Sequence, residues 1–556
     1  MVVWALMVGL FPSSAQHVTT AAGKTVGTLP PVYGGDAVAG QSGAAGAATA
    51  TGEGSAPGAS GAGTKSPAAQ TAAASQAARQ SGVARSGVAC GPGVRQLPGS
   101  SYAAPCRAKF TGDNGGATWR GVTATSIKIV SRLYANTPDE QAIESQAAAA
   151  GYPPMSVRQQ VRKVFVDYFN KNFELYGRTV DLQDFQSNAS YADEVRNEGR
   201  EVACADATAI AQERKGFGVM PPPAFLGLGP FSECSAQQGL EVPIGPYGFP
   251  EGFYQKYHPY IWAEVMTCDR LAYLAVEFMV KQLANQPAAW ARDPALRTQP
   301  RKLGYLIPNV GAYASCIELL KKLWASNGFA PASTFVYDVD PSTMPQQAAQ
   351  AVAQFRQAGV TTVGIQDFVM TTNLTIQADQ QGWGPEWVFG GAGLNDADPL
   401  ARGFKQPEVD GHLFGLTTLG EGRYTIGADG EAARLYKQLT GQALPFGLAG
   451  EYFNLLQLFN MLQSAGPDLT PDAVATGMFS MPPASGPDDG RWDFRTGVDG
   501  SPNTASHTAN LDVRIVHWNA NATAADGQKG AYIGFFDNRR FAVHEFLSSP
   551  LPGPGG

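Results

Sequence analysis

The residue types that usually carry catalysis are present in this chain, but their spacing matches no catalytic motif. No G-x-S-x-G occurs, which argues against an α/β-hydrolase, and neither H-E-x-x-H nor a P-loop is found. The segments LGLGPF and FGGAGLND do not complete a dinucleotide-binding fingerprint. No two of the six histidines are four residues apart, as in the i, i+4 pairs that bind metals on helices. They are His17, His258, His412, His507, His517 and His544. We therefore predict a protein that is not an enzyme and that binds no cofactor.

An acidic run at 487–500 could suggest calcium, because carboxylate oxygens are the ligands that this ion prefers. Asp488, Asp489, Asp493 and Asp499 lie close together in it. The run departs from the EF-hand pattern, since it has no Glu at the twelfth position. We predict a turn-rich, solvated loop and no metal site.

Six cysteines, an even number, are typical of disulfides in an exported protein. They are Cys90, Cys106, Cys204, Cys234, Cys268 and Cys316. Six cysteines allow 15 pairings, and proximity along the chain favours joining each to its next neighbour, which gives three bonds. The alternative is six buried thiols in a cytosolic protein. Zinc does not fit, because no C-x-x-C or clustered histidine accompanies them.

The N-terminus also suggests export. MVVWALMVGLFPSSAQ has an apolar stretch followed by small residues, so residues 1–15 are predicted to be a signal peptide. Its lack of a basic start suggests a true start further upstream; the alternative is a frayed apolar terminus. Residues 16–88 are mostly Ala, Gly, Ser, Thr and Gln, and cannot bury enough apolar surface to fold, so we predict a flexible linker. No later stretch reaches the ~20 apolar residues that span a bilayer.

Charge and composition narrow the partners. The 556 residues carry a formal net charge of −7, and no run of Lys or Arg is long enough to follow a phosphate backbone. We therefore predict no nucleic-acid partner. Hydrophobic residues make up 44% of the chain, which is enough for a large core. The protein is expected to be an extracytoplasmic monomer.

The predicted strands and helices that must position any site begin only after the first hundred residues of the chain. After a disulfide-closed lead-in at 89–115, predicted strands and helices alternate from 126 to 391, in two series of about four strands each. Strands separated by helices indicate parallel sheets built from βαβ units. The pattern predicts an α/β protein of two doubly wound, Rossmann-like lobes. A strand is also predicted at 259–266, one helix near 191–213, a helix capped by Thr470, and two antiparallel strands near the C-terminus.

The segments GVTATSIKIV, GEYFNLLQLFNMLQSAG and DVRIVHWN, in this order around the two series, resemble the type I periplasmic solute-binding proteins. The nearest group is the leucine/isoleucine/valine-binding branch of ABC importers. The resemblance implies two lobes joined by a crossover hinge, with a small-molecule ligand in the cleft between them. The first lobe would take 116–268 and 425–480, and the second 269–424 and 481–556.

The resemblance also implies a function and a partner. The protein would capture an amino-acid-like or an aromatic or amide compound for an ABC importer permease. The alternative is a ligand-sensing or non-transport binding module of the same fold, and a secreted enzyme is less favoured.

The family's cleft loops, carried over by position, name candidate ligand contacts. Those in the first lobe are Tyr134, Asn136, Tyr247 and Phe249, and the others are Asn309, Tyr313, Gln366, Asp367 and Phe446. The chain departs from the family at PPPAFLGLGPFSE, which lacks the usual hydroxyls, and at Ala392, where the family often has an acidic residue. Asp367 or Asp396 could replace that residue. The alternative for each candidate is packing within a lobe or capping of a helix.

Overall fold

The computed structural model describes residues 82–554, apart from short internal gaps. The positions not described within this range are 150–151, 196–197, 224, 226, 264, 341, 366–367, 392–394 and 421–429. The predicted signal peptide and most of the predicted linker lie outside the described residues. Where the description begins, Gly82–Val83 (β1) pairs with Ala89–Cys90 (β2), inside the end of the predicted linker. The Ala84 N–H donates to the Val88 carbonyl at 2.8 Å and closes this turn.

The first sheet is parallel and has the strand order β4–β3–β5. Its strands are β3 (Ser126–Leu133), β4 (Thr179–Gln186) and β5 (Gly218–Met220). Isolated parallel bridges continue it from Gly218 to Glu241 and from Val242 to Ile261. The predicted strand at 259–266 is therefore wrong, because only single bridges form there. After Val242, the next N–H that bonds to this segment is that of Gly245, which donates to the Trp262 carbonyl at 2.8 Å, so the pairing is irregular.

Helices cover both faces of this sheet, and together they form what we call the first lobe. Ile127 and Ile129 of β3 pack in one core cluster with α4 (Met155–Asn172) and α16 (Ala449–Ala465). Val130 points to the other face, where α6 (Arg200–Gln212) and α7 (Gly229–Gln237) pack. This alternation is the period of two that a strand imposes on its side chains.

The second sheet has the order β7–β6–β8–β9–β10–β13–β14. Its strands are β6 (Leu303–Pro308), β7 (Ser333–Tyr337), β8 (Thr362–Ile365), β9 (Glu386–Gly390), β10 (Leu413–Thr417), β13 (Asp512–Thr523) and β14 (Lys529–Gly534). The first five are parallel, and β13 and β14 are antiparallel, as predicted.

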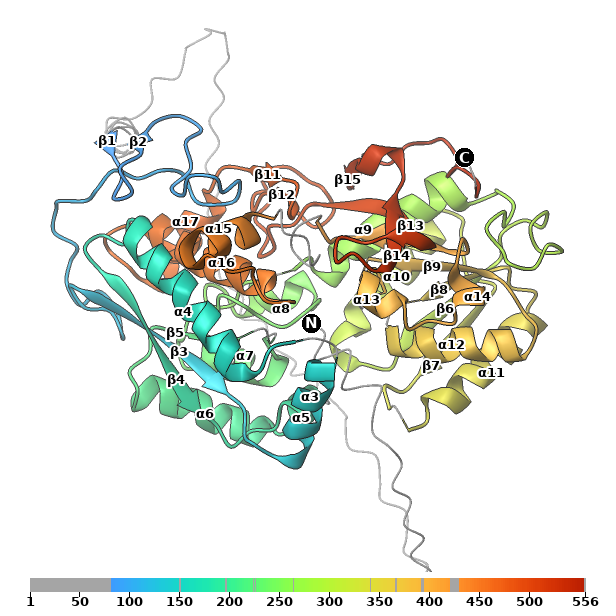
Figure 1. The fold of residues 1–556 in the computed structure, drawn as a ribbon, viewed down its shortest axis with the longest axis horizontal. Coiled ribbons are helices and arrows are strands. Elements are labelled where there is room, and N and C mark those ends of the chain that lie inside the picture. Colours follow the sequence, from blue (N-terminus) through green and yellow to red (C-terminus); the bar gives the residue numbers. More distant parts are fainter. Residues whose placement is uncertain are drawn as a thin grey trace, which may run out of the picture. The chain divides into compact units, whose positions relative to one another are not determined.

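Helices also cover both faces of the second sheet and complete the second lobe (Figure 1). On one face, Tyr305 and Ile307 of β6 share a core cluster with α9 (Cys268–Phe278) and α10 (Ala314–Ser326). On the other face, Leu306 packs with α11 (Met344–Gln357) and α12 (Phe368–Gln380). Two doubly wound α/β lobes were predicted, and this prediction is confirmed.

Further elements complete the described structure. They are α3 (Pro138–Ala149), α5 (Tyr191–Val195), α8 (Glu251–Lys256), the π-helix η1 (Met279–Leu283), the 3₁₀-helices η2 (Gly311–Tyr313) and η3 (Phe536–Asn538), α13 (Asp398–Ala401), α14 (Gln406–Val409), α15 (Glu431–Thr440), α17 (Pro471–Phe479), β11 (Ala484–Gly486), β12 (Gly490–Trp492) and β15 (Arg540–Ala542). The single helix predicted near 191–213 is two helices, because Gly199, in the left-handed region at φ 65°, precedes α6. As predicted, Thr470 caps α17 by accepting from the Ala473 N–H.

The core of the first lobe draws on segments far apart in sequence. Leu97 and Tyr102 of the lead-in pack there, and so do Trp492 and Phe494, although the sequence analysis grouped 481–556 with the second lobe. The long helix α16 is buried along most of its length, and its buried residues include the polar Glu451, Asn454, Gln457, Asn460 and Gln463. Among the described residues, no helix combines the length and the hydropathy needed to cross a membrane.

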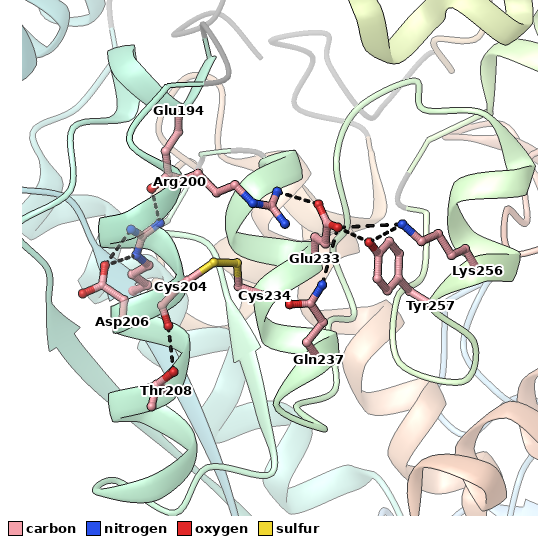
Figure 2. Close-up of a disulfide and its surroundings, with 11 residues drawn as sticks. Glu194, Arg200, Cys204, Asp206, Thr208, Glu233, Cys234, Gln237, Lys256 and Tyr257 are labelled. Atoms are coloured by element: carbon pink, nitrogen blue, oxygen red, sulfur yellow. Dashed lines mark hydrogen bonds and ion pairs between the residues drawn. A yellow bond between two sulfur atoms is a disulfide. The ribbon is translucent and has the colours of Figure 1, made fainter. Parts of the chain in front are cut away.

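Three disulfides join the cysteines in the predicted pairs, Cys90–Cys106, Cys204–Cys234 and Cys268–Cys316. Figure 2 shows the second of these, which ties α6 to α7 beside the Glu233 carboxylate. Arg200 donates to Glu233 at 2.6 Å, and the Tyr257 hydroxyl also donates to it. The third bond ties the start of α9 to the first turn of α10.

Candidate functional site

Both sheets have the same order at their centres, which fixes where a ligand would bind. Strand β3 lies between β4 and β5, and β6 lies between β7 and β8, so each sheet reverses its winding direction at these strands. In open α/β sheets, ligands bind beyond the carboxyl ends of the strands at this switch point. Tyr134 directly follows β3 and Asn309 directly follows β6.

A cavity of about 130 Å³ lies at this edge of the second lobe, between β6, α9 and α10. Its wall is mostly apolar. Lining side chains include Leu271, Ala272 and Ala275 of α9, Tyr305 and Ile307 of β6, Ile317 and Leu320 of α10, and Tyr337 at the end of β7. Tyr247 and Gly248 of the first-lobe loop GPYGF also line it. Both lobes therefore contribute to its wall.

Small side chains on α9 explain why the cavity between β6, α9 and α10 is not filled. Helix α9 presents the small side chains of Ala272 and Ala275 at successive turns, where a larger residue would fill the cavity. The Tyr305 ring lies over Gly364 of β8, and a Cβ at that glycine would stand 2.4 Å from Tyr305 Cδ2. Tyr305 also meets Trp324 edge to face, with ring centroids 4.8 Å apart. The tyrosine is thereby held against the sheet.

Three predicted site residues meet beside this cavity. Tyr247 and Tyr313 both line it and are partly exposed, and the Tyr313 hydroxyl lies 3.5 Å from the Tyr247 carbonyl. Phe249 stands edge to face with Tyr313, at 6.3 Å between ring centroids, and with Phe253 at 4.9 Å. These rings form an aromatic mouth, which we define as Tyr247, Phe249 and Tyr313.

Tyr134 and Asn136 lie elsewhere. The Tyr134 ring packs against Tyr191 at 4.9 Å and Phe225 at 5.8 Å in a separate cluster of the first lobe. Burial raises the pKa of Tyr134 well above its usual value. Asn136 is exposed and accepts a hydrogen bond from Gln141. Neither residue lines the cavity.

The remaining candidates are also dispersed. Asn309 is exposed and donates to Asp338 at 2.8 Å. Phe446 packs edge to face on Tyr152, with ring centroids 4.9 Å apart. Gln366 and Asp367 lie outside the described residues. Of the seven predicted contacts that lie in the described part of the chain, Tyr247 and Tyr313 line the cavity and Phe249 packs beside them.

Asp396, the alternative partner for a ligand ammonium, lies at the end of β10 and not at the cavity. It accepts a hydrogen bond from the Thr417 hydroxyl at 2.6 Å, and burial raises the pKa of its carboxyl to about 6. Asp396 is therefore a buried carboxyl group whose hydrogen-bond partner comes from its own lobe.

At the corresponding strand end of the first lobe lies a charged group. Arg132, near the end of β3, is buried and forms ion pairs at 2.6 Å with Glu194 and with Asp206. Its guanidinium also stacks on Phe231, 4.2 Å from the ring centroid. Burial raises the pKa of Glu194 to about 7, although the neighbouring Arg132 opposes this shift. We call these three charged residues the Arg132 cluster.

The acidic run at 487–500 is not the solvated loop that was predicted, because Asp488 and Asp489 are buried. Asp488 accepts from the Glu431 N–H at 2.6 Å, and Asp489 accepts from the Trp492 indole at 2.8 Å. These carboxylates satisfy buried donors of the first lobe, which a linear pattern does not show.

The apolar side chains from α9 and α10 that line the cavity were missed by the sequence analysis. Leu271, Ala275 and Leu320 have the spacing of ordinary core residues on amphipathic helices, so nothing in the pattern distinguishes them. Two alanines one turn apart on α9 are the only hint of space. The described lining contains no Asp, Glu, Lys, Arg or His, and its two cysteines are joined in a disulfide. This wall is suited to holding an apolar group.

Comparison with known proteins shows likeness only at the level of structure. No protein-family model and no curated protein matches the chain. A substrate-binding protein of an ABC transporter from Aeropyrum pernix, 11% identical, has a TM-score of 0.51 and covers 76% of this chain and 97% of its own.

Two further solved structures have somewhat lower scores. A fatty acid ABC transporter substrate-binding protein from Thermomonospora curvata is 16% identical over 77% of this chain and 97% of its own, with a TM-score of 0.49. A leucine-, isoleucine-, valine-, threonine- and alanine-binding protein from Brucella ovis is 14% identical over 76% and 97%, also with a TM-score of 0.49. At these identities the likeness concerns the fold.

Proposed function

We propose that this chain, which has the fold of the ABC-transporter substrate-binding proteins, captures a small organic solute at the aromatic mouth. The observation that carries the proposal is the cavity of about 130 Å³ at the carboxyl edge of the second sheet, lined by residues of both lobes. Concave, mostly apolar sites with a few polar groups are typical of ligand pockets. The solute is an amino-acid-like, aromatic or amide compound.

The partner in this proposal is an ABC importer permease, and the protein works outside the cytoplasm as a monomer. Three disulfides support that location, since such bonds persist in oxidising compartments. The site acts by binding alone, because the described lining offers no nucleophile with a base beside it. A ligand-sensing module of the same fold remains the second candidate.

Tyr247, Phe249 and Tyr313 are the primary contacts in this proposal. Tyr134, Asn136, Asn309, Gln366, Asp367 and Phe446 are assigned to the outer walls of the cleft by the family resemblance. Binding that favours a closed state shifts the balance between open and closed forms, which is the action expected of a two-lobed capture protein.

A thermal-shift screen of amino acids, short peptides, aromatic acids and small amides tests the proposal. A true solute at 100 times its Kd should stabilise the protein by about 2.7 kcal/mol. The shift should weaken in Tyr247→Ala and in Asp367→Ala, and persist in Trp119→Ala, a control at an exposed aromatic residue.

Two outcomes would contradict this assignment. If both variants bind the solute as tightly as the unmodified protein, the cleft contacts are wrong. If the solute recovered after incubation is chemically changed, the protein is an enzyme.

A further inference from the structure

The cavity between β6, α9 and α10, which we call the second-lobe cavity, leaves apolar side chains open to solvent. On α9, Leu271 is 8% exposed and Ala275 is 6%, whereas Leu274, which lies between them in sequence, is fully buried at 0%. Leu320 of α10, which also lines the cavity, is 8% exposed. A small molecule can therefore reach these side chains, and covering them with another apolar group would be favourable.

The volume sets the size of the group that can enter. An engineered apolar cavity of about 150 Å³ in an unrelated protein stays dry and admits benzene. The second-lobe cavity, about 130 Å³, therefore accommodates a hydrocarbon group of at most about six carbon atoms. Whole drug-sized ligands need roughly 300–1,000 Å³. The cavity thus takes one end of a solute, and the rest of that solute lies outside it.

The side chains around the cavity favour an uncharged, apolar group. None of the described lining residues is Asp, Glu, Lys, Arg or His, and an unpaired charge is very costly to bury. Apart from the Cys268–Cys316 disulfide, every lining residue on α9 and α10 has a hydrocarbon side chain. Polar groups are available at the aromatic mouth, where the Tyr313 hydroxyl lies 3.5 Å from the Tyr247 carbonyl. The polar part of a solute is therefore expected at the mouth.

We propose that the second-lobe cavity is a subsite for the uncharged hydrocarbon end of an amphipathic solute, a chain or ring of about six carbon atoms. This inference rests on the proposed function, since it names the class of solute. The hydrocarbon packs against Leu271 and Ala275 of α9 and against Leu320 of α10. The polar end of the solute stays at the aromatic mouth.

Primary alkanamides of increasing length test this subsite on the full chain, with fluorobenzene as the reporter in fluorine NMR. Fluorobenzene should bind, and the Kd of each amide follows from the displacement of this reporter. From butanamide to hexanamide, the affinity should rise about fourfold with each methylene that becomes buried. 6-Hydroxyhexanamide should bind at least about fivefold more weakly than hexanamide, because its terminal hydroxyl would be buried among hydrocarbon side chains.

Filling the cavity supplies the second arm of the test. Ala275→Leu should abolish binding of fluorobenzene, because the added atoms occupy the space that the probe needs. Ala272→Leu, one turn earlier on α9, fills the same cavity and replaces the first variant if that variant does not fold. Ala325→Leu, at an exposed position of α10, is the matched control and should bind fluorobenzene with an unchanged Kd.

Four results would each overturn the inference. The first is that fluorobenzene does not bind the unmodified protein, and the second is that it binds the filled variants equally well. The third is that the affinity does not rise from butanamide to hexanamide. The fourth is that 6-hydroxyhexanamide binds as tightly as hexanamide.

Failure of this inference is distinguishable from failure of the proposed function. A solute from the thermal-shift screen that still binds Ala275→Leu and does not displace fluorobenzene supports the function and overturns the subsite. Probe binding that follows the expected pattern without any solute in the screen supports the subsite and overturns the function.

Discussion

The carboxyl ends of the two central strands differ in chemistry although their sheets have the same strand order. At the end of β3, Arg132 is buried between two carboxylates and an aromatic ring. At the end of β6 lies a cavity with no charged residue in its described lining. The end of β3 is filled by charged side chains that pair with each other, whereas the end of β6 leaves an apolar cavity.

This contrast teaches where each lobe can accept a ligand. A buried ion must keep its partners, because removing one leaves an uncompensated charge. The Arg132 cluster is therefore fixed in place and serves the first lobe itself. The apolar cavity loses little when another apolar group enters, so the second lobe is better suited to contribute the deep part of the site.

The largest effect on stability is expected from Arg132→Met, which removes the cation of the Arg132 cluster at the end of β3. Two carboxylates would stay buried without their cation, so the free energy of unfolding should fall by about 3–5 kcal/mol. Urea denaturation measures this. The control is Lys163→Met, which removes an exposed pair with Asp167 and should cost less than about 1 kcal/mol. Similar losses in both variants would show that burial adds nothing to the Arg132 cluster.

A matched pair of insertions sharpens the contrast in packing. Ala207→Leu adds a large side chain to the filled core of the first lobe and should cost about 1–3 kcal/mol. Ala275→Leu adds the same atoms to the second-lobe cavity and should change stability by less than about 1 kcal/mol, because the space already exists. Thermal and urea unfolding compare the two. Equal losses would mean that the cavity cannot accommodate added atoms.

The smallest effect concerns pH and again belongs to the charged end. Because the folded pKa of Glu194 is raised to about 7, the folded protein binds more protons than the unfolded chain between roughly pH 4.5 and 7. This group's contribution is therefore present below pH 4.5 and is lost as the pH rises through 7. It should amount to about 1–2 kcal/mol between pH 5 and 8.

Glu194→Gln cannot titrate and removes this contribution. The stability of the variant should fall less between pH 5 and 8 than that of the unmodified protein, as measured by urea denaturation at each pH. A parallel pH dependence in the two proteins would place the raised pKa on a different group.

Local sequence was sufficient for most of the fold. The alternation of apolar strands with amphipathic helices predicted two doubly wound lobes, and Thr470 before Pro471 predicted the start of α17, because these signals depend on neighbours within a few residues. The cysteine pairing was also predictable, since the cysteines bond in chain order, the first with the second, the third with the fourth and the fifth with the sixth. The described residues of the strand predicted at 259–266 form only isolated bridges, because their pairing depends on the irregular partner segment at 242–245.

The site could be predicted only in part. Tyr247, Phe249 and Tyr313 were named because the family resemblance places their loops at the cleft between the lobes. Ala275, Leu320 and Tyr337 look in sequence like ordinary core residues. Whether an alanine leaves a cavity, or a tyrosine hydroxyl finds a partner, depends on which side chains arrive from distant segments. Only the tertiary structure decides that, because volume and hydrogen bonding are properties of the packed neighbours and not of the chain's own pattern.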